Sequence, residues 1–290
     1  MKREYTFAFL SIFLWSTMAT AGKLLLGTFN STQVLCVSSL LAGITLLIIN
    51  LVFRKSVFAA SYRPKDYWKM LLIGLPGTFL YYIFYYAGAE DLLASQAFII
   101  NYMWPIMSIV FACLLLKEKL TFRKVIAIAL SFVGVLFVAG PELLMFDQRS
   151  AFGIALCFAA AVCYGLFTAL SKKENYDSCF AMMVSFFATF ILSVLIIVAR
   201  RDYFSVSAPN FLGFVWNGVF TMAIPNTLWL VALKKGNTAK ISNLAYITPF
   251  LSMVWTTLLL KEQPNFLSLI GLAIMVGGIF VQLKEPSEKK

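Results

Sequence analysis

The sequence contains no histidine and little acidic charge. Only 13 of its 290 residues are aspartate or glutamate, and 13% of all residues are charged. Without histidine, a serine or cysteine nucleophile has no imidazole to act as its base, and a metal lacks one of its usual protein ligands. These absences argue against an enzyme, and we expect neither a metal nor any other cofactor.

Cysteine is also scarce, and its placement argues against a disulfide framework. The five residues are odd in number, form no CxxC pair and lie in or beside apolar runs. We expect free thiols that pack as small hydrophobic side chains. The residues concerned are Cys36, Cys113, Cys157, Cys163 and Cys179.

Long hydrophobic runs make up most of the sequence. Hydrophobic residues account for 61% of the chain, and the mean hydropathy is +0.84. A run of roughly 20 apolar residues can cross the hydrocarbon layer as a helix, so we predict an all-α integral membrane protein with ten transmembrane helices. The runs cover residues 5–22, 32–53, 67–88, 95–115, 122–139, 152–171, 178–199, 211–233, 239–260 and 266–283.

Basic residues gather on one side of the predicted membrane. A net charge of +11 would favour a nucleic-acid partner in a soluble protein, but here the bases lie in short connections between the runs. With the N-terminus inside, the cytoplasmic segments hold 19 of the 24 lysines and arginines and the outer connections hold 5. The positive-inside rule therefore places both termini on the cytoplasmic side, and we expect the protein in a bacterial inner membrane. No nucleic-acid partner is expected.

The second half of the sequence repeats the first. A shift of 144 residues places thirteen residues between positions 102 and 134 onto identical residues between positions 246 and 278. The sequence Leu-Leu-Leu-Lys-Glu, which ends the fourth run and recurs at the end of the ninth, anchors this register. A slightly different shift places Trp15 on Tyr164, so the first run also matches the sixth.

This repetition predicts the architecture. Each unit holds five helices, an odd number, so the second unit must enter the membrane from the opposite side. We predict two inverted repeats, residues 1–140 and 150–284, and a short cytoplasmic tail at 285–290. A signal-peptide interpretation of residues 1–22 is disfavoured because cleavage would remove a helix with a counterpart in the second unit. Inverted repeats in transporters enclose a substrate site near the midplane.

No acidic residue lies deep within an apolar run. A buried carboxylate is the commonest device for coupling transport to protons, so a relay of that kind is not expected. The acids closest to the runs fall at helix ends or in connections. They are Glu90, Asp91, Glu118, Glu174, Asp202 and Glu262.

Aromatic and amide side chains lie where the charges are missing. A chamber with aromatic walls and a few polar groups suits a flat, amphipathic or cationic solute. Trp68, Trp216 and Tyr67 are interpreted instead as anchors at the lipid–water interface. The side chains predicted to stack on the solute are Trp15, Tyr82, Tyr85, Trp104 and Tyr164, and those predicted to bond it are Asn101, Asn226, Asn243 and Thr248.

Some residues are expected to shape the helices or their packing and not to contact the solute. Pro105 and Pro249 occupy matching repeat positions and remove a backbone donor within their helices, which predicts either gates or packing kinks. The Lys-Glu pairs at 117–118 and 261–262 are interpreted as structural helix ends. Small residues suit close helix packing. They are Ala127, Ser131 and Gly134 on the fifth helix and Ala273 and Gly277 on the tenth.

The repeat ends and the glycines at positions 134 and 278 resemble the EamA family of the drug/metabolite transporter superfamily. Residues 14–17, 101–105 and 246–249 resemble, more specifically, its bacterial exporters of aromatic amino acids. This resemblance implies a central cavity lined from the first, third, fourth, sixth, eighth and ninth helices. It adds Tyr102 and Tyr246 to the candidate substrate-binding residues.

One departure from the resemblance concerns the substrate. Relatives often carry an ionisable side chain in the third or fourth helix, where this chain has Thr78, Gln96 and a tyrosine cluster. The leading hypothesis is a secondary transporter that exports aromatic or other neutral amino acids, or related metabolites, by alternating access. The alternatives are a carrier of quaternary ammonium or cationic drug-like compounds and a non-transporting sensor or scaffold. The expected partners are a small-molecule substrate and the lipid bilayer, and the sequence is compatible with a monomer.

Overall fold

The computed structural model describes residues 3–53, 62–117, 121–144, 148–171, 174, 176–235 and 244–283. Every regular element in these ranges is a helix, as the hydrophobic runs predict. Asn243, one of the predicted substrate-binding residues, lies outside the described residues.

The first half of the chain forms helices with several interruptions. Thr17 separates the first two helices, and its hydroxyl donates to the carbonyl of Leu14 at 2.8 Å. Pro64 opens α5 at a position where a missing N–H costs no helical hydrogen bond. The elements are α1 (Arg3–Ser16), α2 (Met18–Leu26), α3 (Ser31–Phe53), α5 (Pro64–Leu75), the π-helical η1 (Pro76–Leu80), α6 (Tyr81–Asp91), α7 (Ala94–Asn101), α8 (Trp104–Leu116) and α9 (Phe122–Leu144).

The second half follows a similar pattern. Asp177 caps α11 by accepting a hydrogen bond from the N–H of Phe180 at 2.9 Å. Pro209 lies in the first turn of α12. The elements are α10 (Gln148–Ser171), α11 (Ser178–Arg200), α12 (Ala208–Val215), the π-helical η2 (Trp216–Ala223), α13 (Ile224–Lys235), the 3₁₀ turn η3 (Ala245–Ile247), α15 (Thr248–Leu260) and α16 (Phe266–Leu283).

Six helical segments in the described part are long and apolar enough to cross a membrane. Shorter apolar helices occupy Thr248–Leu260 and Phe266–Gly278. Large side chains such as Leu24, Leu72 and Leu136 are exposed on the surface of the bundle, as expected where lipid replaces water. The six segments are Arg3–Leu26, Ser31–Phe53, Pro64–Asp91, Ala94–Leu115, Gln148–Ser171 and Ser178–Arg200.

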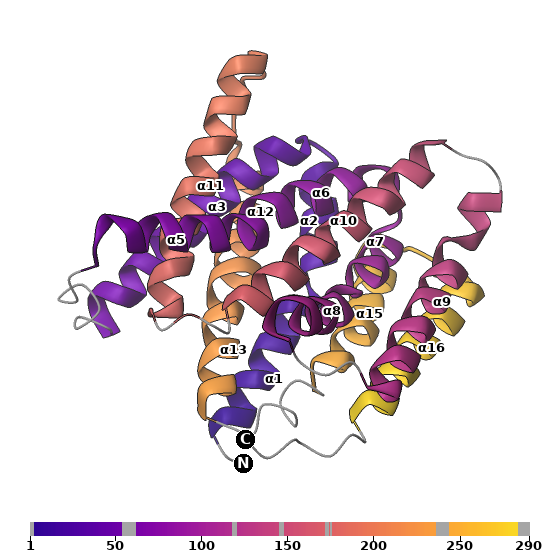
Figure 1. Ribbon diagram of the computed structural model, residues 1–290. Coiled ribbons are helices and arrows are strands. Elements are labelled where there is room, and N and C mark those ends of the chain that lie inside the picture. Colours follow the sequence, from indigo (N-terminus) through magenta and orange to yellow (C-terminus); the bar gives the residue numbers. More distant parts are fainter. Residues whose placement is uncertain are drawn as a thin grey trace.

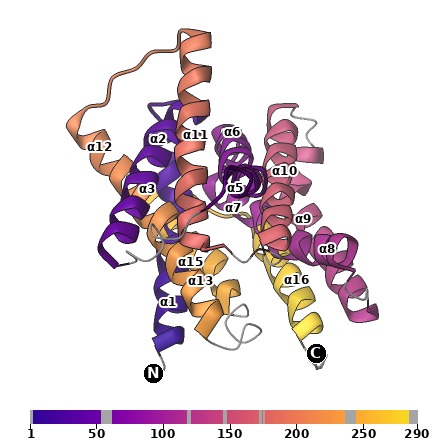
Figure 2. The same ribbon diagram turned by 60° about the vertical axis from the view of Figure 1, so that its left-hand side comes forward.

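The helix pair α9 and α16 forms one flank of the bundle (Figures 1 and 2) and makes the most extensive contact between two described helices. Gly134 and Gly271 face each other there, because a Cβ built on Gly271 would lie 2.4 Å from the Gly134 carbonyl oxygen. The predicted packing role of Gly134 is confirmed. In both views α1 begins and α16 ends at the same end of the bundle.

The packing role predicted for Ala273 and Gly277 is wrong. Ala273 is exposed, and a Cβ built on Gly277 would meet nothing within 4 Å. Gly271, Met275 and Gly278 face α9 instead. Their spacing of four and three residues places them on one face of α16, and Gly277 points away from that face.

Two breaks in the helices fall at positions that the 144-residue shift relates. Tyr102 and Met103 form a turn between α7 and α8, and η3 precedes α15. Pro105 and Pro249 therefore lie in the first turns of α8 and α15, and not in helix interiors as the sequence predicts. Proline suits a first turn because the N–H there has no helical partner.

The two halves share further irregular backbone. Lys117 and Lys261 end α8 and α15 in the left-handed conformation, each with φ of 56°. This conformation is uncommon for a residue with a Cβ, and the 144-residue shift relates the two lysines. The π-helical segments η1 and η2 interrupt the third and the eighth hydrophobic run, respectively. Such segments are rare, and they often occur at functional sites.

Candidate functional site

A narrow cavity lies between helices of both halves, beside the breaks described above. Its volume is about 30 Å³, which admits little more than water. Helices α1, α2, α6, α7, α8, α10, α13 and α15 contribute to its wall. It is lined by Trp15, Met18, Tyr81, Tyr82, Phe98, Asn101, Tyr102, Trp104, Tyr164, Asn226 and Thr248.

The structure brings together eight of the eleven side chains predicted to contact the solute. Those eight are in the wall of the narrow cavity. Tyr85 lies outside the walls of both cavities described here. Asn243 falls outside the described residues, and for Tyr246 only the backbone, in η3, is described. The predicted set also leaves out Tyr81, a member of the tyrosine cluster. Sequence reasoning missed Met18 and Phe98 as well, whose side chains give no signal that separates them from ordinary core residues.

Two asparagines give the narrow cavity its hydrogen-bonding character. Asn226 Oδ1 accepts a hydrogen bond from the Tyr164 hydroxyl at 3.1 Å, and its amide nitrogen donates to the backbone. Asn101 Nδ2 donates to the Tyr81 hydroxyl at 2.9 Å. Asn101 Oδ1 is buried and has no hydrogen-bond partner among the described residues. A buried acceptor without a partner is costly, so this oxygen is available to a donor on a bound solute.

The carbonyl of Ala245, in the break before α15, accepts hydrogen bonds from two side chains. The hydroxyls of Tyr102 and Thr248 both donate to it, the latter at 2.6 Å. The bond from Tyr102 ties the break between α7 and α8 to the break before α15, whereas the bond from Thr248 is local to the second half. Tyr102 therefore holds the two halves together at the cavity as well as lining it.

Tyr164 lies at the centre of the aromatic wall. Its ring centroid is 4.7 Å from that of Tyr81 and 5.1 Å from that of Trp104, whose plane is nearly perpendicular at 82°. Trp15 packs on Trp229 at 5.3 Å. Contacts of this kind fix aromatic rings in place at separations typical of favourable pairs, so the wall is organised in advance for stacking.

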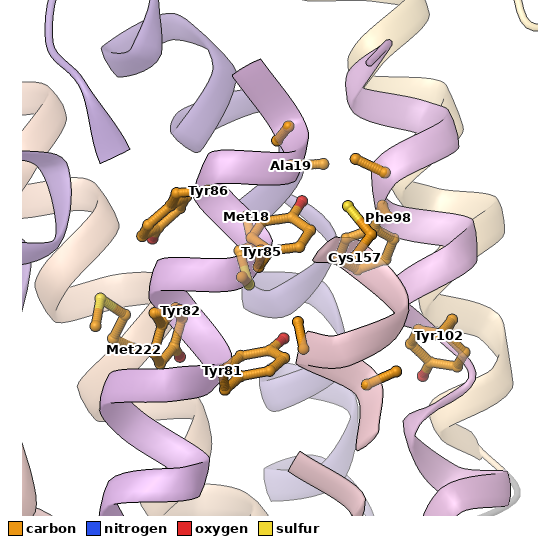
Figure 3. Close-up of a cluster of buried hydrophobic side chains, with 14 of the residues drawn as sticks. Met18, Ala19, Tyr81, Tyr82, Tyr85, Tyr86, Phe98, Tyr102, Cys157 and Met222 are labelled. Atoms are coloured by element: carbon orange, nitrogen blue, oxygen red, sulfur yellow. The ribbon is translucent and has the colours of Figure 1, made fainter. Parts of the chain in front are cut away.

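The four tyrosines of α6 form two columns (Figure 3). Tyr81 stacks with Tyr85 at 6.3 Å, and Tyr82 stacks with Tyr86 at 5.8 Å. The spacing of four residues along a helix produces this arrangement. Only the first member of each column lines the cavity, while the hydroxyl of Tyr85 is buried without a described partner. The columns fill the space beyond the narrow cavity in the direction of the connection after α6.

A wide cavity runs from the narrow one to the connection between α10 and α11. Trp104, Tyr164 and Asn226 line both. Its volume is about 320 Å³, which falls in the range of pockets that bind small organic ligands. Its other lining residues are Met70, Gly74, Thr78, Phe167, Thr168, Ser171, Glu174, Tyr176, Ser178, Ala181, Met182, Ser185 and Trp229.

Helix α11 lines the wide cavity, although the family resemblance assigns the cavity to other helices. Its contribution comes from Ser178, Ala181, Met182 and Ser185. These residues recur every three to four positions and so share one helical face. Two serines and an alanine at this spacing in an otherwise apolar run are the signal that sequence reasoning overlooked.

The wide cavity has one acidic side chain in its described wall. The Glu174 carboxylate lies 2.7 Å from Lys69 Nζ, and its side chain is 11% exposed. Burial, together with the charge of Glu174, raises the pKa of Tyr176 to about 12, so this phenol is a neutral hydrogen-bond donor at physiological pH. The sequence places Glu174 in a connection but gives no indication that it faces a cavity.

The described residues offer no evident metal site. Among them, no group of three or more histidine, cysteine, aspartate or glutamate side chains is placed to hold an ion. The cysteines are free thiols, as the sequence predicts, and all are buried or half-buried. The side chains that line the two cavities offer stacking, hydrogen bonding and, at Glu174, a negative charge.

Known proteins similar to this chain are named as transporters. An uncharacterized transporter of Clostridium kluyveri is 28% identical, over 97% of this chain and 93% of its own length. The uncharacterized transporter YetK of Bacillus subtilis is 25% identical, over 83% of this chain and 75% of its own. The aromatic amino acid exporter YddG of Ancylobacter novellus is 23% identical, over 94% of each chain. One solved structure has the same fold, with a TM-score of 0.69 and 21% identity over 96% of both chains.

The family model for EamA-like transporters matches the chain twice, over residues 2–140 and over residues 151–283. The two matches together cover nearly the whole chain, and they confirm the resemblance that the repeated motifs indicate. A family of transporters with apolar helices also accounts for the scarcity of charge noted at the outset. This chain therefore belongs to the EamA-like transporter family of the drug/metabolite transporter superfamily, and it is a multi-pass membrane transporter and not an enzyme.

Proposed function

We propose that this protein is a secondary transporter that exports aromatic or other neutral amino acids, or related metabolites, by alternating access. The observation that carries the proposal is the narrow cavity, where aromatic faces surround a buried amide oxygen without a partner. An aromatic solute would stack on Trp104 and Tyr164, and its amino group would donate to Asn101 Oδ1. A relative is named an aromatic amino acid exporter.

The proposed architecture is ten membrane crossings in two inverted repeats around the central cavity. The double match of the family model supports it. So do the related breaks before Pro105 and Pro249 and the left-handed lysines at 117 and 261. With five crossings in each unit, the second unit lies inverted relative to the first.

The proposed orientation places both termini in the cytoplasm of a bacterial inner membrane. The excess of basic residues in the alternate connections supports it. The connection between α10 and α11 then lies on the cytoplasmic side, so the wide cavity is the inward path to the narrow one. In this proposal the chain works as a monomer in the lipid bilayer, with a small-molecule substrate and no nucleic-acid partner.

Flux measurements in proteoliposomes test the proposed function. Purified protein should give saturable uptake or release of radiolabelled phenylalanine or tryptophan above that of protein-free vesicles. The Trp68→Ala variant is a matched control, since that ring is 67% exposed and lies on α5 away from both cavities. Protein that is folded but gives no saturable flux of any neutral amino acid would contradict the proposal. Repeating the assay with and without a pH gradient tests the expectation that no buried carboxylate couples protons.

One observation favours a second candidate, a carrier of cationic compounds. Glu174 lines the wide cavity, and aromatic rings around a carboxylate suit quaternary ammonium groups. Flux of a radiolabelled quaternary ammonium compound, with unlabelled competitors, separates the two functions. Inhibition by choline-like cations without inhibition by unlabelled amino acids would favour the cation carrier.

A further inference from the structure

The connection between α6 and α7 is held by charged side chains from other elements. α6 ends at Asp91 and α7 begins at Ala94, so the carbonyls that end one helix and the amides that begin the next lie close together. The residue before α7, Leu93, offers no side-chain cap. Helix ends expose unpaired backbone groups, which need partners when they are buried.

Lys23 supplies partners for the end of α6. Its ammonium group donates to the carbonyls of Ala89 at 2.5 Å, Leu92 at 2.6 Å and Glu90 at 3.2 Å. A cation at the carboxyl end of a helix is also favoured by the helix dipole. Lys23 belongs to α2, so this contact joins α2 to the α6–α7 connection.

Glu262 supplies the missing cap of α7. Its carboxylate accepts hydrogen bonds from the N–H of Ala94 at 2.7 Å and from the N–H and hydroxyl of Ser95 at 3.0 and 2.8 Å. Glu262 is only 9% exposed and comes from the second half of the chain. The left-handed backbone of Lys261 turns the chain after α15 toward α7. From the sequence, we interpret this Lys-Glu pair as a structural helix end. In the structure, Glu262 also joins the two halves of the chain.

A second contact between the halves lies nearby, between the connections after α2 and α11. The side chains of Asn30 and Gln33 donate to Asp202, the latter at 3.2 Å to the carboxylate. Within the first half, the Glu90 carboxylate accepts a hydrogen bond from the N–H of Ser31 at 2.6 Å, which joins the end of α6 to the start of α3. These contacts lie at the end of the molecule opposite to the mouth of the wide cavity, and the tyrosine columns of α6 separate them from the narrow cavity.

We propose that Glu262 and Lys23 form a latch that keeps the outer side of the transporter closed in this conformation, with Glu262 as the residue that sets the balance between closed and open. The proposal rests on the proposed function for its orientation. Opening the outer side must separate α7 from α15, which removes three hydrogen bonds from the buried Glu262 carboxylate. Hydrogen bonds to a charged group are the strong ones, so their loss must be offset by water entering the opened path.

Chemical accessibility tests the latch without measuring transport. The reporter is Met18→Cys in a chain whose five native cysteines are replaced by alanine. Met18 is 3% exposed and lines the narrow cavity from α2, the helix that also carries Lys23. A membrane-impermeant maleimide added outside intact cells should label this cysteine slowly. Adding Glu262→Ala should make labelling about tenfold faster, as expected from the loss of charged hydrogen bonds, and Lys23→Gln should also make it faster.

A matched control comes from the opposite side. Lys69→Gln removes the ion pair with Glu174 at the mouth of the wide cavity and should not make labelling from outside faster. Equal acceleration by Lys69→Gln and Glu262→Ala would overturn the latch, and so would unchanged labelling in folded Glu262→Ala and Lys23→Gln proteins. If Glu262→Ala does not fold, the labelling rates of Glu262→Gln and Lys23→Gln are compared with that of Lys69→Gln instead. Absence of saturable flux of any neutral amino acid in a protein with the expected labelling pattern would refute the proposed function and leave the latch standing.

Discussion

The two cavities of this protein share three residues but differ in size and chemistry. The narrow cavity has a volume of about 30 Å³ and is lined by aromatic rings and amides, while the wide cavity has about 320 Å³ and includes Glu174. Trp104, Tyr164 and Asn226 lie at their junction. The wide cavity has room for a small organic molecule, whereas the side chains best suited to recognise one are packed against each other. If the narrow cavity recognises the solute, as proposed, it must open by movement of the surrounding helices.

The largest effect on this comparison is expected at the junction. Trp104→Ala removes a ring that lines both cavities and contacts Tyr164. Loss of its stacking and apolar area is worth about 2–3 kcal/mol, so the apparent affinity for phenylalanine should fall about 30- to 150-fold. Concentration dependence of flux in proteoliposomes measures it, with Trp68→Ala as control. Equal affinities in the two variants would contradict a role for the junction.

The second-largest effect is expected in the narrow cavity, at the buried amide oxygen of Asn101. Asn101→Leu should weaken binding of aromatic amino acids about tenfold, because the solute's ammonium group loses a charged hydrogen bond. Binding of 3-phenylpropionate, which lacks that group, should change little. Competition assays with both compounds measure the difference. Asn50→Leu is a matched control, since Asn50 is also buried with an unpartnered oxygen but lies on α3 outside both cavities. If Asn101→Leu weakened binding of both compounds equally, the proposed contact between the solute's ammonium group and Asn101 Oδ1 would be contradicted.

A change remote from both cavities should alter stability without altering selectivity. Gly271→Ala places a Cβ 2.4 Å from a carbonyl oxygen of α9, and overpacking of this kind costs about 1 kcal/mol or more. Thermal unfolding in detergent should show a lower midpoint. Gly277→Ala, on the same helix but in open space, should be neutral or slightly stabilising because alanine favours helix. A lower unfolding midpoint for Gly277→Ala than for Gly271→Ala would contradict the conclusion that Gly271 lies on the face of α16 that packs on α9.

The smallest effect is expected in the wide cavity. Glu174→Gln removes its acidic group, which already has Lys69 as a partner, so inhibition by a quaternary ammonium competitor should weaken only about two- to threefold. The affinity for phenylalanine should stay the same. Inhibition constants from the flux assay measure both quantities. A large loss of phenylalanine affinity would mean that recognition begins in the wide cavity.

The sequence predicts the helices and most of the narrow cavity because both depend on local, strongly patterned signals. Apolar runs mark the helices, and aromatic or amide residues stand out within them, so Trp15, Asn101 and Tyr164 are recognisable. The wide cavity is harder to predict. Glu174 belongs to a connection, and Ser178 begins a helix, so neither is unusual in its own segment. Only the packing of both α10 and α11 against α5 and η1 brings them to one space.

Burial of helix ends is likewise invisible in the sequence. Glu262 follows a helix and precedes a short connection, which is the ordinary setting of a solvated acid. Its burial depends on the left-handed turn at Lys261 and on the position of α7, which lies far away in the chain. Similarly, the glycine contact of α16 could be placed only once its helical phase was known, which explains why Gly271 was missed and Gly277 was predicted.

The pairing of α9 with α16 has a consequence for biogenesis. In the proposed architecture of ten crossings, α9 enters the membrane more than a hundred residues before its partner, because the chain is made from its N-terminus. During that interval Gly134 and its neighbours face lipid or the insertion machinery. The flank of the bundle can form only when the last described helix has been inserted. A ribosome stalled before α16 would therefore leave an incomplete transporter with an open small-residue surface, which is the form that membrane quality control would be expected to recognise.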